Sequence, residues 1–314
     1  MSLNASPETA ALPADDHIVP DSERRGLIGA LPRGARPYAS LIRLDRPIGA
    51  WLLYWPGAWS VVLAEPRGGE WWLLLWLALG AWAMRSAGCV YNDIVDRDLD
   101  RKVERTRLRP LASGRASIEG AWALLVAMSL IGLVVLLQLD PTAQIVALAS
   151  LAPVAAYPFM KRITWWPQAW LGLVFSWAAL VGWPAVTGRI ELPALLLYGG
   201  SIFWVIGYDT IYALQDKEDD ALVGVKSSAL ALGAKARLGI GFCYAAAFAL
   251  WGAAIWTVRS EALALAALAP LGFHLIWQVT TLRQDDGTDA LAKFRSNRFA
   301  GLLMFLACLV VGNS

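Results

Sequence analysis

Two clusters of acidic residues each begin at the end of an apolar stretch and continue beyond it. In the first cluster Asn92, Asp96 and Asp100 recur every four residues, and Asp93 lies within one turn of Asp96. At about 100° per residue of α-helix, side chains four apart drift by only ~40° and therefore share one face. Rows of carboxylate and amide oxygens suit hard divalent cations, so we predict Mg²⁺ here, with Mn²⁺ as the alternative.

The second cluster contains Asp209, Asp216 and Asp220, which the same count places within about 40° of one another. Asp209 lies inside an apolar stretch, and an acidic residue within a membrane indicates a functional site by default. Two rows of carboxylates that face each other at one membrane surface would repel unless a cation lay between them. The pair of clusters therefore predicts a cation site better than either cluster alone, because a single charged loop is usually solvated.

Basic residues accompany the acids and could bind phosphate oxygens. Proteins commonly hold Mg²⁺ by one or two carboxylates together with the phosphates of a substrate. Acids, cations and an apolar bundle in this arrangement predict a site for a lipid diphosphate, with its head group at the surface and its tail among the helices. The basic residues concerned are Arg101, Arg105, Arg109, Lys161, Arg162 and Lys226.

The elements that must position these residues are membrane helices. Hydrophobic residues make up 57% of the 314 residues and charged residues 17%, which excludes an ordinary soluble domain and a disordered chain; no nucleic-acid partner is expected. A helix of about 20 apolar residues spans a bilayer, and this length predicts an all-α, polytopic protein with nine membrane helices. The predicted spans are 47–64, 71–91, 118–138, 142–160, 166–187, 192–214, 237–258, 261–281 and 296–312.

The distribution of positive charge predicts the orientation of these spans. Seven of the 27 Lys and Arg lie between residues 97 and 115, after the second span, whereas the loops after spans one, five and seven hold one each. By the positive-inside rule the N-terminus and both acidic clusters are cytoplasmic, and the C-terminus is outside. Residues 1–36 carry no apolar signal segment and are predicted to be a disordered or surface-lying arm. Residues 37–314 form the membrane domain, which we expect in a bacterial inner membrane.

The acidic motifs resemble those of the UbiA-type family of intramembrane aromatic prenyltransferases. The resemblance runs from about Tyr38 to near the C-terminus. The motifs are N-D-x-x-D-R-x-x-D with R-T-x-x-R-P-L (92–111), Y-D-T followed by acids and G-V-K-S (208–227), and Y-P-x-x-K-R (157–162). The segment R-L-D-R-P-I-G (43–49) fits the branch of the family that acts on 4-hydroxybenzoate.

The resemblance implies nine helices around a central cavity that opens sideways to lipid, and Mg²⁺ that bridges both acidic motifs and a prenyl diphosphate. It implies metal contacts by Asn92, Asp96, Asp100, Asp216 and Asp220, and catalytic roles for Asp93, Asp96, Asp209 and Asp216. It implies substrate contacts by Arg43, Asn92, Arg105, Arg109, Tyr157, Lys161, Arg162 and Lys226.

The reaction that the resemblance implies is transfer of a polyprenyl group to the ring carbon ortho to the hydroxyl of 4-hydroxybenzoate, in ubiquinone biosynthesis. Departure of diphosphate leaves an allylic cation, which aromatic faces stabilise and a dry cavity protects from water. The carboxylate of the acceptor needs an arginine, and Arg43 and Arg162 are the candidates. Asp93 or Asp209 assists loss of the ring proton or orients a basic side chain.

Two other interpretations are open at this stage. The acceptor is a naphthoate or a homogentisate in other branches of the family, and the acidic motifs do not discriminate between them. A cation-coupled secondary transporter also places acids in a polytopic bundle, but transporter sites tend to lie near the bilayer midplane. Neither the prenyl chain length nor the oligomeric state can be read from the sequence.

Overall fold

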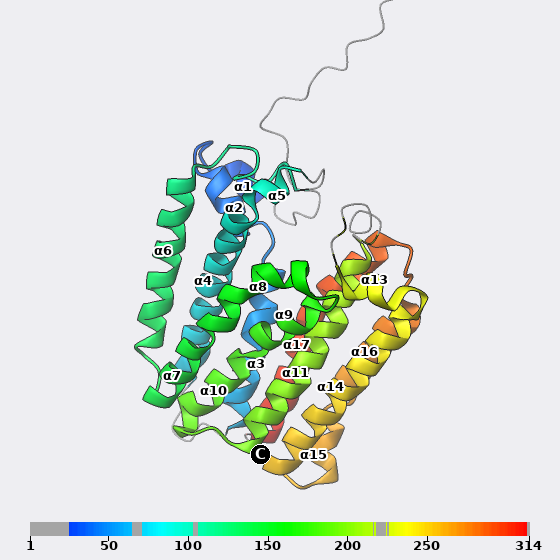
Figure 1. The fold of residues 1–314 in the computed structure, drawn as a ribbon. Coiled ribbons are helices and arrows are strands. Elements are labelled where there is room, and N and C mark those ends of the chain that lie inside the picture. The colour runs from blue at the N-terminus through cyan, green and yellow to red at the C-terminus, as the bar shows by residue number, and fades with distance from the viewer. Residues whose placement is uncertain are drawn as a thin grey trace, which may run out of the picture.

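The computed structural model describes residues 25–64, 71–102, 106–215, 217, 224 and 226–312. Every regular element in these ranges is helical, which confirms the predicted all-α class (Figure 1). The helices are α1 (Arg25–Ala30), α2 (Arg36–Leu41), α3 (Ile48–Leu63), α4 (Trp72–Val95), α5 (Arg97–Asp100), α6 (Ile118–Leu136), α7 (Pro141–Ala149), α8 (Leu151–Ile163), α9 (Pro167–Ser176), α10 (Ala178–Thr187), α11 (Leu192–Leu214), α13 (Ser228–Leu232), α14 (Ala236–Val258), α15 (Ala262–Ala266), α16 (Ala269–Thr281) and α17 (Gly287–Gly312), with a short 3₁₀ turn at Gly233–Lys235.

Eight helical segments of the described chain are long and apolar enough to cross a membrane. Four of them consist of helices that follow one another closely, namely α7 with α8, α9 with α10, α13 with α14 across the 3₁₀ turn, and α15 with α16. The remaining predicted span is α3, which has 16 residues and is therefore about 24 Å long, shorter than the ~30 Å apolar core of a bilayer. The count of nine spans and the cytoplasmic side of the N-terminus stay predictions.

Local sequence explains where several helices begin. The Ser117 side chain accepts a hydrogen bond from the backbone N–H of Gly120 and caps α6. The Asp140 side chain accepts from the N–H of Thr142, and Pro141 then occupies the first position of α7. Both arrangements satisfy N–H groups that lack partners within the helix.

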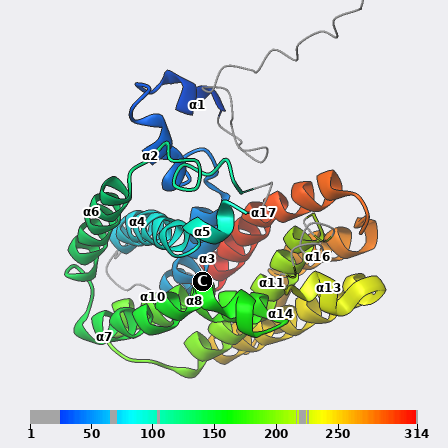
Figure 2. The same cartoon turned by 45° about the horizontal axis from the view of Figure 1, so that its top comes forward.

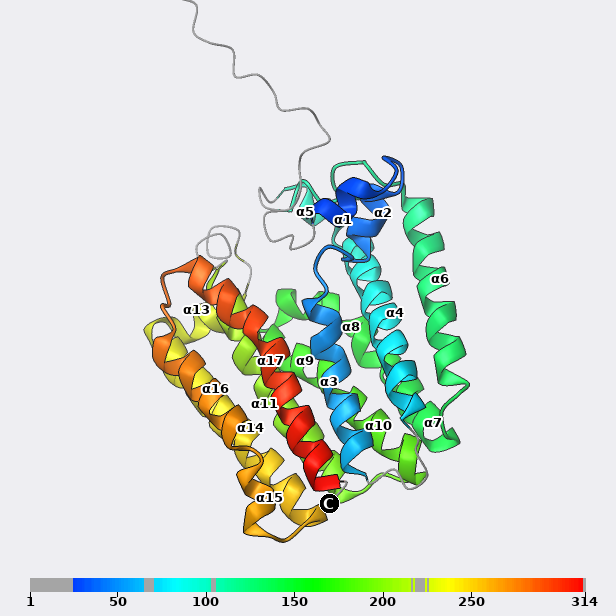
Figure 3. The same cartoon turned by 180° about the vertical axis from the view of Figure 1, so that it is seen from behind.

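The centre of the bundle is packed with tryptophan. Trp59 of α3 lies 5.3 Å from Trp204 of α11 and 5.2 Å from Trp251 of α14, measured between ring centroids. The indole N–H of Trp59 donates to the carbonyl oxygen of Gly301 in α17, at 2.9 Å. These contacts join α3 to α11, α14 and the last helix, α17, and Figure 3 shows α17 beside α3.

Helix α6 and the α7–α8 pair are the least buried parts of the bundle. Only 17% and 11% of their most apolar windows are buried, against 28% to 56% for the other six candidate spans. Helix α6 packs mainly against α4, and it contacts α2 at the end that is predicted to face the cytoplasm. The apolar side chains on its outer face, such as Val126 and Leu130, are exposed and suited to contact lipid.

Small residues let α10 cross α3 at short range. A Cβ atom added to Gly182 would overlap the carbonyl oxygen of Gly57 and lie 3.0 Å from the Cβ of Ser60. We therefore expect Gly182→Ala to destabilise the protein by about 1–3 kcal/mol, because backbone atoms must shift. The matched control is Gly252→Ala in α14, whose added Cβ would meet only side-chain atoms at 3.9 Å. Thermal unfolding in detergent should give a lower Tm for Gly182→Ala alone; equal Tm values would contradict this packing.

The ends of the two helices that lead into the acidic clusters lie on the same side of the bundle. Helix α5 follows α4, and α13 is the next helix after α11 in the described chain; both appear in the upper part of Figure 1, opposite α15 and the C-terminus. Figure 2 turns this end toward the viewer and shows α5 above α3 and α8.

Candidate active site

The first acidic row keeps its predicted helical phase beyond the end of α4. Asn92 lies in the last turn of α4, Asp96 joins α4 to α5, and Asp100 ends α5. The N–H of Asp96 donates to the carbonyl of Asn92 at 2.9 Å, and the N–H of Asp100 to that of Asp96 at 2.8 Å. These i to i−4 bonds continue the helical geometry, which explains why residues at this spacing stay on one side.

Arginine side chains neutralise the buried acids of this row. Arg43 donates to Asp93 at 2.7 Å, and Arg162 donates to Asp96 at 3.0 Å. One nitrogen of Arg109 lies 3.3 Å from Asp93 and 2.9 Å from Asp100. Such pairing is required because an unpaired buried carboxylate is costly. The second oxygen of Asp93 is buried and makes no hydrogen bond to the described residues.

The surroundings of this network shift two pKa values outside the spans. Burial raises the pKa of Asp100, and the neighbouring Arg109 opposes this effect only in part. Burial alone would lower the pKa of Arg43, but Asp93, with smaller contributions from Cys89 and Asp45, outweighs burial, so the pKa of Arg43 is raised. Arg43 therefore stays a cation, whereas the charge of Asp100 depends on the cations beside it.

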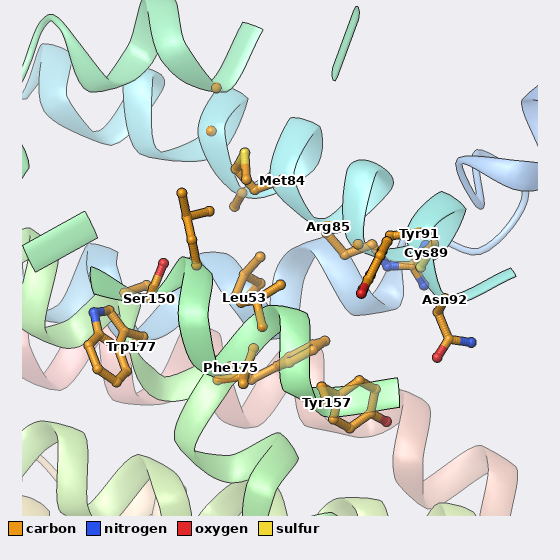
Figure 4. A pocket seen from close by; sticks show the side chains of 18 of the residues that line it. Leu53, Met84, Arg85, Cys89, Tyr91, Asn92, Ser150, Tyr157, Phe175 and Trp177 are labelled. Atoms are coloured by element: carbon orange, nitrogen blue, oxygen red, sulfur yellow. The ribbon is translucent and has the colours of Figure 1, made fainter. Parts of the chain in front are cut away.

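A cavity of about 790 Å³ extends from the acidic row into the bundle. Arg43, Arg85, Asn92, Asp100 and Arg109 line its polar part. Figure 4 shows Arg85, Asn92 and Tyr157 toward one end, with Leu53 and Phe175 farther along and Trp177 and Ser150 at the other end. The apolar wall comes from α6 to α8 and includes Leu133, Leu136, Leu139, Leu148, Leu151 and Val154.

The structure brings together part of the predicted set of site residues. Arg43, Asn92, Asp100, Arg109 and Tyr157 line the cavity, and Asp93, Asp96 and Arg162 belong to the adjoining ion pairs. Asp209 lies half-buried in α11. Lys226 donates to the carbonyl oxygen of Ile163 at the end of α8.

The other predicted site residues lie wholly or partly outside the described residues. Arg105, Asp216 and Asp220 lie outside the described residues, as does the side chain of Lys161, whose backbone belongs to α8. Helix α11 ends at Leu214, so the proposed common face of Asp209, Asp216 and Asp220 stays a prediction. The predicted arm also falls mostly on residues outside the described ranges, although 25–30 form α1.

Sequence reasoning did not select Arg85, whose side chain lines the cavity from α4. Gly49 of α3 makes room for it, because a Cβ at that position would lie 2.6 Å from the Arg85 Nε atom. Its guanidinium makes no hydrogen bond or ion pair with a residue of the described chain. An arginine in the middle of an apolar span is itself a functional signal, and that signal would have found it. Tyr54, Cys89 and Thr106 also line the cavity and were not selected.

The described residues supply only part of a metal site. Within them, no three His, Cys, Asp or Glu side chains lie close enough to hold an ion. Asn92, Asp96 and Asp100 nevertheless present oxygen donors on one side of the α4–α5 segment, and oxygen donors are what Mg²⁺ and Mn²⁺ prefer. The donor chemistry of this row therefore fits such a cation, with other ligands still required.

Residues 53–309 match the UbiA prenyltransferase family. The chain belongs to this family. It is thus a multi-pass membrane enzyme of the prenyltransferase class, and the transporter interpretation is not supported. The family membership confirms the resemblance seen in the acidic motifs.

Relatives with known names cover most of this UbiA-family chain. It is 45% identical over 284 residues to the mitochondrial 4-hydroxybenzoate polyprenyltransferase of Drosophila melanogaster, covering 89% of this chain and 72% of that protein. It is 44% identical over 293 residues to the enzyme of the same name from Rattus norvegicus, covering 91% of this chain and 77% of that protein. Both names specify mitochondria, so the predicted bacterial inner membrane finds no support in these relatives.

Solved UbiA structures share the fold. A UbiA homolog from Aeropyrum pernix K1 matches with a TM-score of 0.70 and 26% identity, over 83% of this chain and 97% of that one. A UbiA homolog from Archaeoglobus fulgidus, solved bound to GPP and Mg²⁺, matches with a TM-score of 0.62 and 18% identity, over 88% of this chain and 99% of that one. The second likeness concerns the fold alone.

Proposed function

We propose that this protein transfers a polyprenyl group from a polyprenyl diphosphate to the ring carbon ortho to the hydroxyl of 4-hydroxybenzoate, for ubiquinone biosynthesis. The observation that carries the proposal is the cavity, which joins a charged end to a long apolar body. A prenyl diphosphate has the same division between a charged head and an apolar tail. The names of the relatives support 4-hydroxybenzoate over a naphthoate or a homogentisate.

The charged end of the cavity is proposed to hold the diphosphate with Mg²⁺, or Mn²⁺ in its place. Asn92, Asp96 and Asp100 would hold the metal, together with Asp216 and Asp220. When bound, the metal supplies a positive charge that stabilises the departing diphosphate. Arg109 and Arg162 already lie beside this row, and with Arg105, Lys161 and Lys226 they are assigned to the phosphate oxygens.

The body of the cavity is proposed to protect the carbon centre that forms when the allylic C–O bond breaks. Tyr54, Tyr157 and Phe175 line this part, and aromatic faces attract a delocalised cation. The leucines of α6 to α8 exclude water, which would otherwise trap the cation as an alcohol. The ring carbon of the acceptor then forms the new C–C bond, and the proton leaves that carbon.

Arg85 is the residue that we assign to the carboxylate of the acceptor. Arg43 donates to Asp93 and to the carbonyl of Ser40, and Arg162 donates to Asp96. Arg85 lines the cavity and forms no ion pair or hydrogen bond with a described residue. Asp93 lies between two guanidinium groups, which favours an orienting role for Asp93 over uptake of the ring proton. Uptake of the ring proton is therefore assigned to Asp209.

Incubation with the substrates tests this proposal. Membranes that contain the protein, given 4-hydroxybenzoate, geranyl diphosphate and Mg²⁺, should form geranylated benzoate and release diphosphate. EDTA should abolish both products, and excess Mg²⁺ should restore them. Chromatography of the lipid extract and a diphosphate assay measure the two products. Prenylation of a naphthoate or a homogentisate but not of 4-hydroxybenzoate would refute the acceptor, and turnover that EDTA leaves unchanged would refute the metal.

The membrane and the side are part of the same proposal. The clustering of Lys and Arg between residues 97 and 115 supports a site on the cytoplasmic side of a bacterial inner membrane. A mitochondrial membrane is the alternative that the names of the relatives favour.

A further inference from the structure

The turn that follows α2 has an arginine where backbone geometry favours glycine. Arg43 has φ of +56° and is the only non-glycine residue of the described chain with a positive φ. The N–H of Leu44 donates to the carbonyl of Ala39, and the N–H of Arg43 to that of Ser40. This pair of bonds is the Schellman arrangement, whose left-handed residue is usually glycine. The arginine strains a turn that a glycine would form without strain.

The strained turn aims the Arg43 side chain at α4. Its Nη2 atom donates to Asp93 at 2.7 Å, and its Nη1 atom donates back to the carbonyl of Ser40 at 3.1 Å. The side chain is 9% exposed, and that of Asp93 is fully buried. The guanidinium is therefore occupied on both sides, although it forms part of the cavity wall.

Asp93 links Arg43 to the charged residues at the polar end of the cavity. The oxygen that accepts from Arg43 also lies 3.3 Å from Nη1 of Arg109. The same nitrogen of Arg109 lies 2.9 Å from Asp100. Four elements thus meet in one chain of charges, namely the turn after α2, the end of α4, the loop after α5 and the end of α5.

We propose that Arg43 is a positioning residue, which holds Asp93 and through it fixes Arg109 and Asp100 at the charged end of the cavity. The inference rests on the proposed function, because Arg109 is assigned there to the diphosphate and Asp100 to the metal. Arg43 compensates part of the charge of Asp93, so Arg109 stays divided between two acids. Without Arg43, Asp93 draws Arg109 away from Asp100.

The substitution Arg43→Gly tests the contribution of the guanidinium separately from that of the turn geometry. Loss of the buried ion pair should lower the Tm of the detergent-purified protein. Because glycine suits the positive φ, Arg43→Gly should nevertheless keep a higher Tm than Arg43→Ala, which also lacks the guanidinium. Loss of the guanidinium should lower kcat by about 10- to 100-fold, the usual effect of removing a supporting contact, with the KM for 4-hydroxybenzoate unchanged. Arg43→Lys keeps the charge but lacks the planar fork, so its kcat should fall between those of Arg43→Gly and the wild type.

Arg36→Gln is the matched control. Arg36 begins α2, the helix that precedes this turn, and in the described chain its side chain donates to the carbonyls of Gly29 and Leu31, so kcat should equal that of the wild type. A second test uses Asp93→Asn, alone and with Arg43→Gly. Because both residues act through one contact, the double variant should lose no more activity than the more damaged single variant.

Four results would overturn the inference. A raised KM for 4-hydroxybenzoate with unchanged kcat would make Arg43 a ligand of the acceptor. A Tm of Arg43→Gly no higher than that of Arg43→Ala would contradict the strained turn. An equal loss of activity in Arg36→Gln would indicate a general effect on the segment, and additive losses in the double variant would uncouple Arg43 from Asp93. A wild-type protein with no prenyl transfer would instead refute the proposed function, so the two failures are distinguishable.

Discussion

Asp96→Asn should reduce prenyl transfer by about 100- to 1000-fold at saturating substrates, the loss that follows removal of one group stabilising charge in a transition state. The substitution keeps the size of the side chain but removes the negative charge that a divalent cation requires. Asp96 is fully buried and lies in phase with Asn92 and Asp100. Its partner Arg162 is half-exposed, so water can solvate that cation and the fold should persist.

Asp98→Asn is the control for this prediction. Asp98 lies two residues away in α5, is exposed, and pairs with Arg97 and Arg101 at the surface. Such pairs contribute little, so its kcat should stay at the wild-type value. The measurement is initial rate of product formation against Mg²⁺ concentration. Wild-type rates in Asp96→Asn at every Mg²⁺ concentration would remove Asp96 from the metal site.

Arg85→Leu should lower kcat/KM for 4-hydroxybenzoate by about 10- to 100-fold, because a hydrogen bond to a charged group contributes roughly 1.5–3 kcal/mol. The KM for the prenyl diphosphate should not change. The same substitution removes a cation that forms no ion pair or hydrogen bond with the described residues, so Tm should rise. This opposite movement of activity and stability distinguishes a ligand-binding arginine from one that supports the fold.

The amide of the acceptor supplies the control for Arg85. 4-Hydroxybenzamide has the same ring and hydroxyl but no negative charge, so the wild type and Arg85→Leu should use it with similar kcat/KM. Steady-state kinetics with both acceptors measure the difference. A raised KM for the donor, with no difference between the two acceptors, would place Arg85 at the diphosphate and refute its assignment to the carboxylate.

The membrane spans were predictable because an apolar stretch must be long enough to cross the bilayer as a helix. Predicted 192–214 coincides with α11 (Leu192–Leu214), and predicted 118–138 nearly coincides with α6 (Ile118–Leu136). The start of α17 was not predictable from hydropathy: the helix begins at Gly287, nine residues before the predicted 296. Asp289 and Lys293 pair one turn apart at 2.5 Å there, so the helix continues through polar residues that an apolar scan rejects.

The acidic row of the site followed from spacing alone, because backbone hydrogen bonds at i to i−4 fix the phase of Asn92, Asp96 and Asp100. The partners of these acids did not follow from spacing. Arg43 and Asp93 are 50 residues apart in sequence, and Arg162 and Asp96 are 66 apart, so their pairing depends on how helices pack. The position of Arg85 at the cavity and the aromatic wall of the cavity likewise depend on how the helices pack, and not on sequence spacing.

The exposed setting of α6 and the α7–α8 pair affects how this enzyme must be assayed. These helices supply the leucine wall of the cavity, yet they are the least buried spans of the described chain. The outer support of that wall is therefore the surrounding solvent of the helices, whether acyl chains or detergent. Rate constants for long-chain prenyl diphosphates will then depend on bilayer thickness and acyl composition. Kinetics measured in micelles and in liposomes will therefore differ, because detergent holds the cavity wall in one case and lipid holds it in the other.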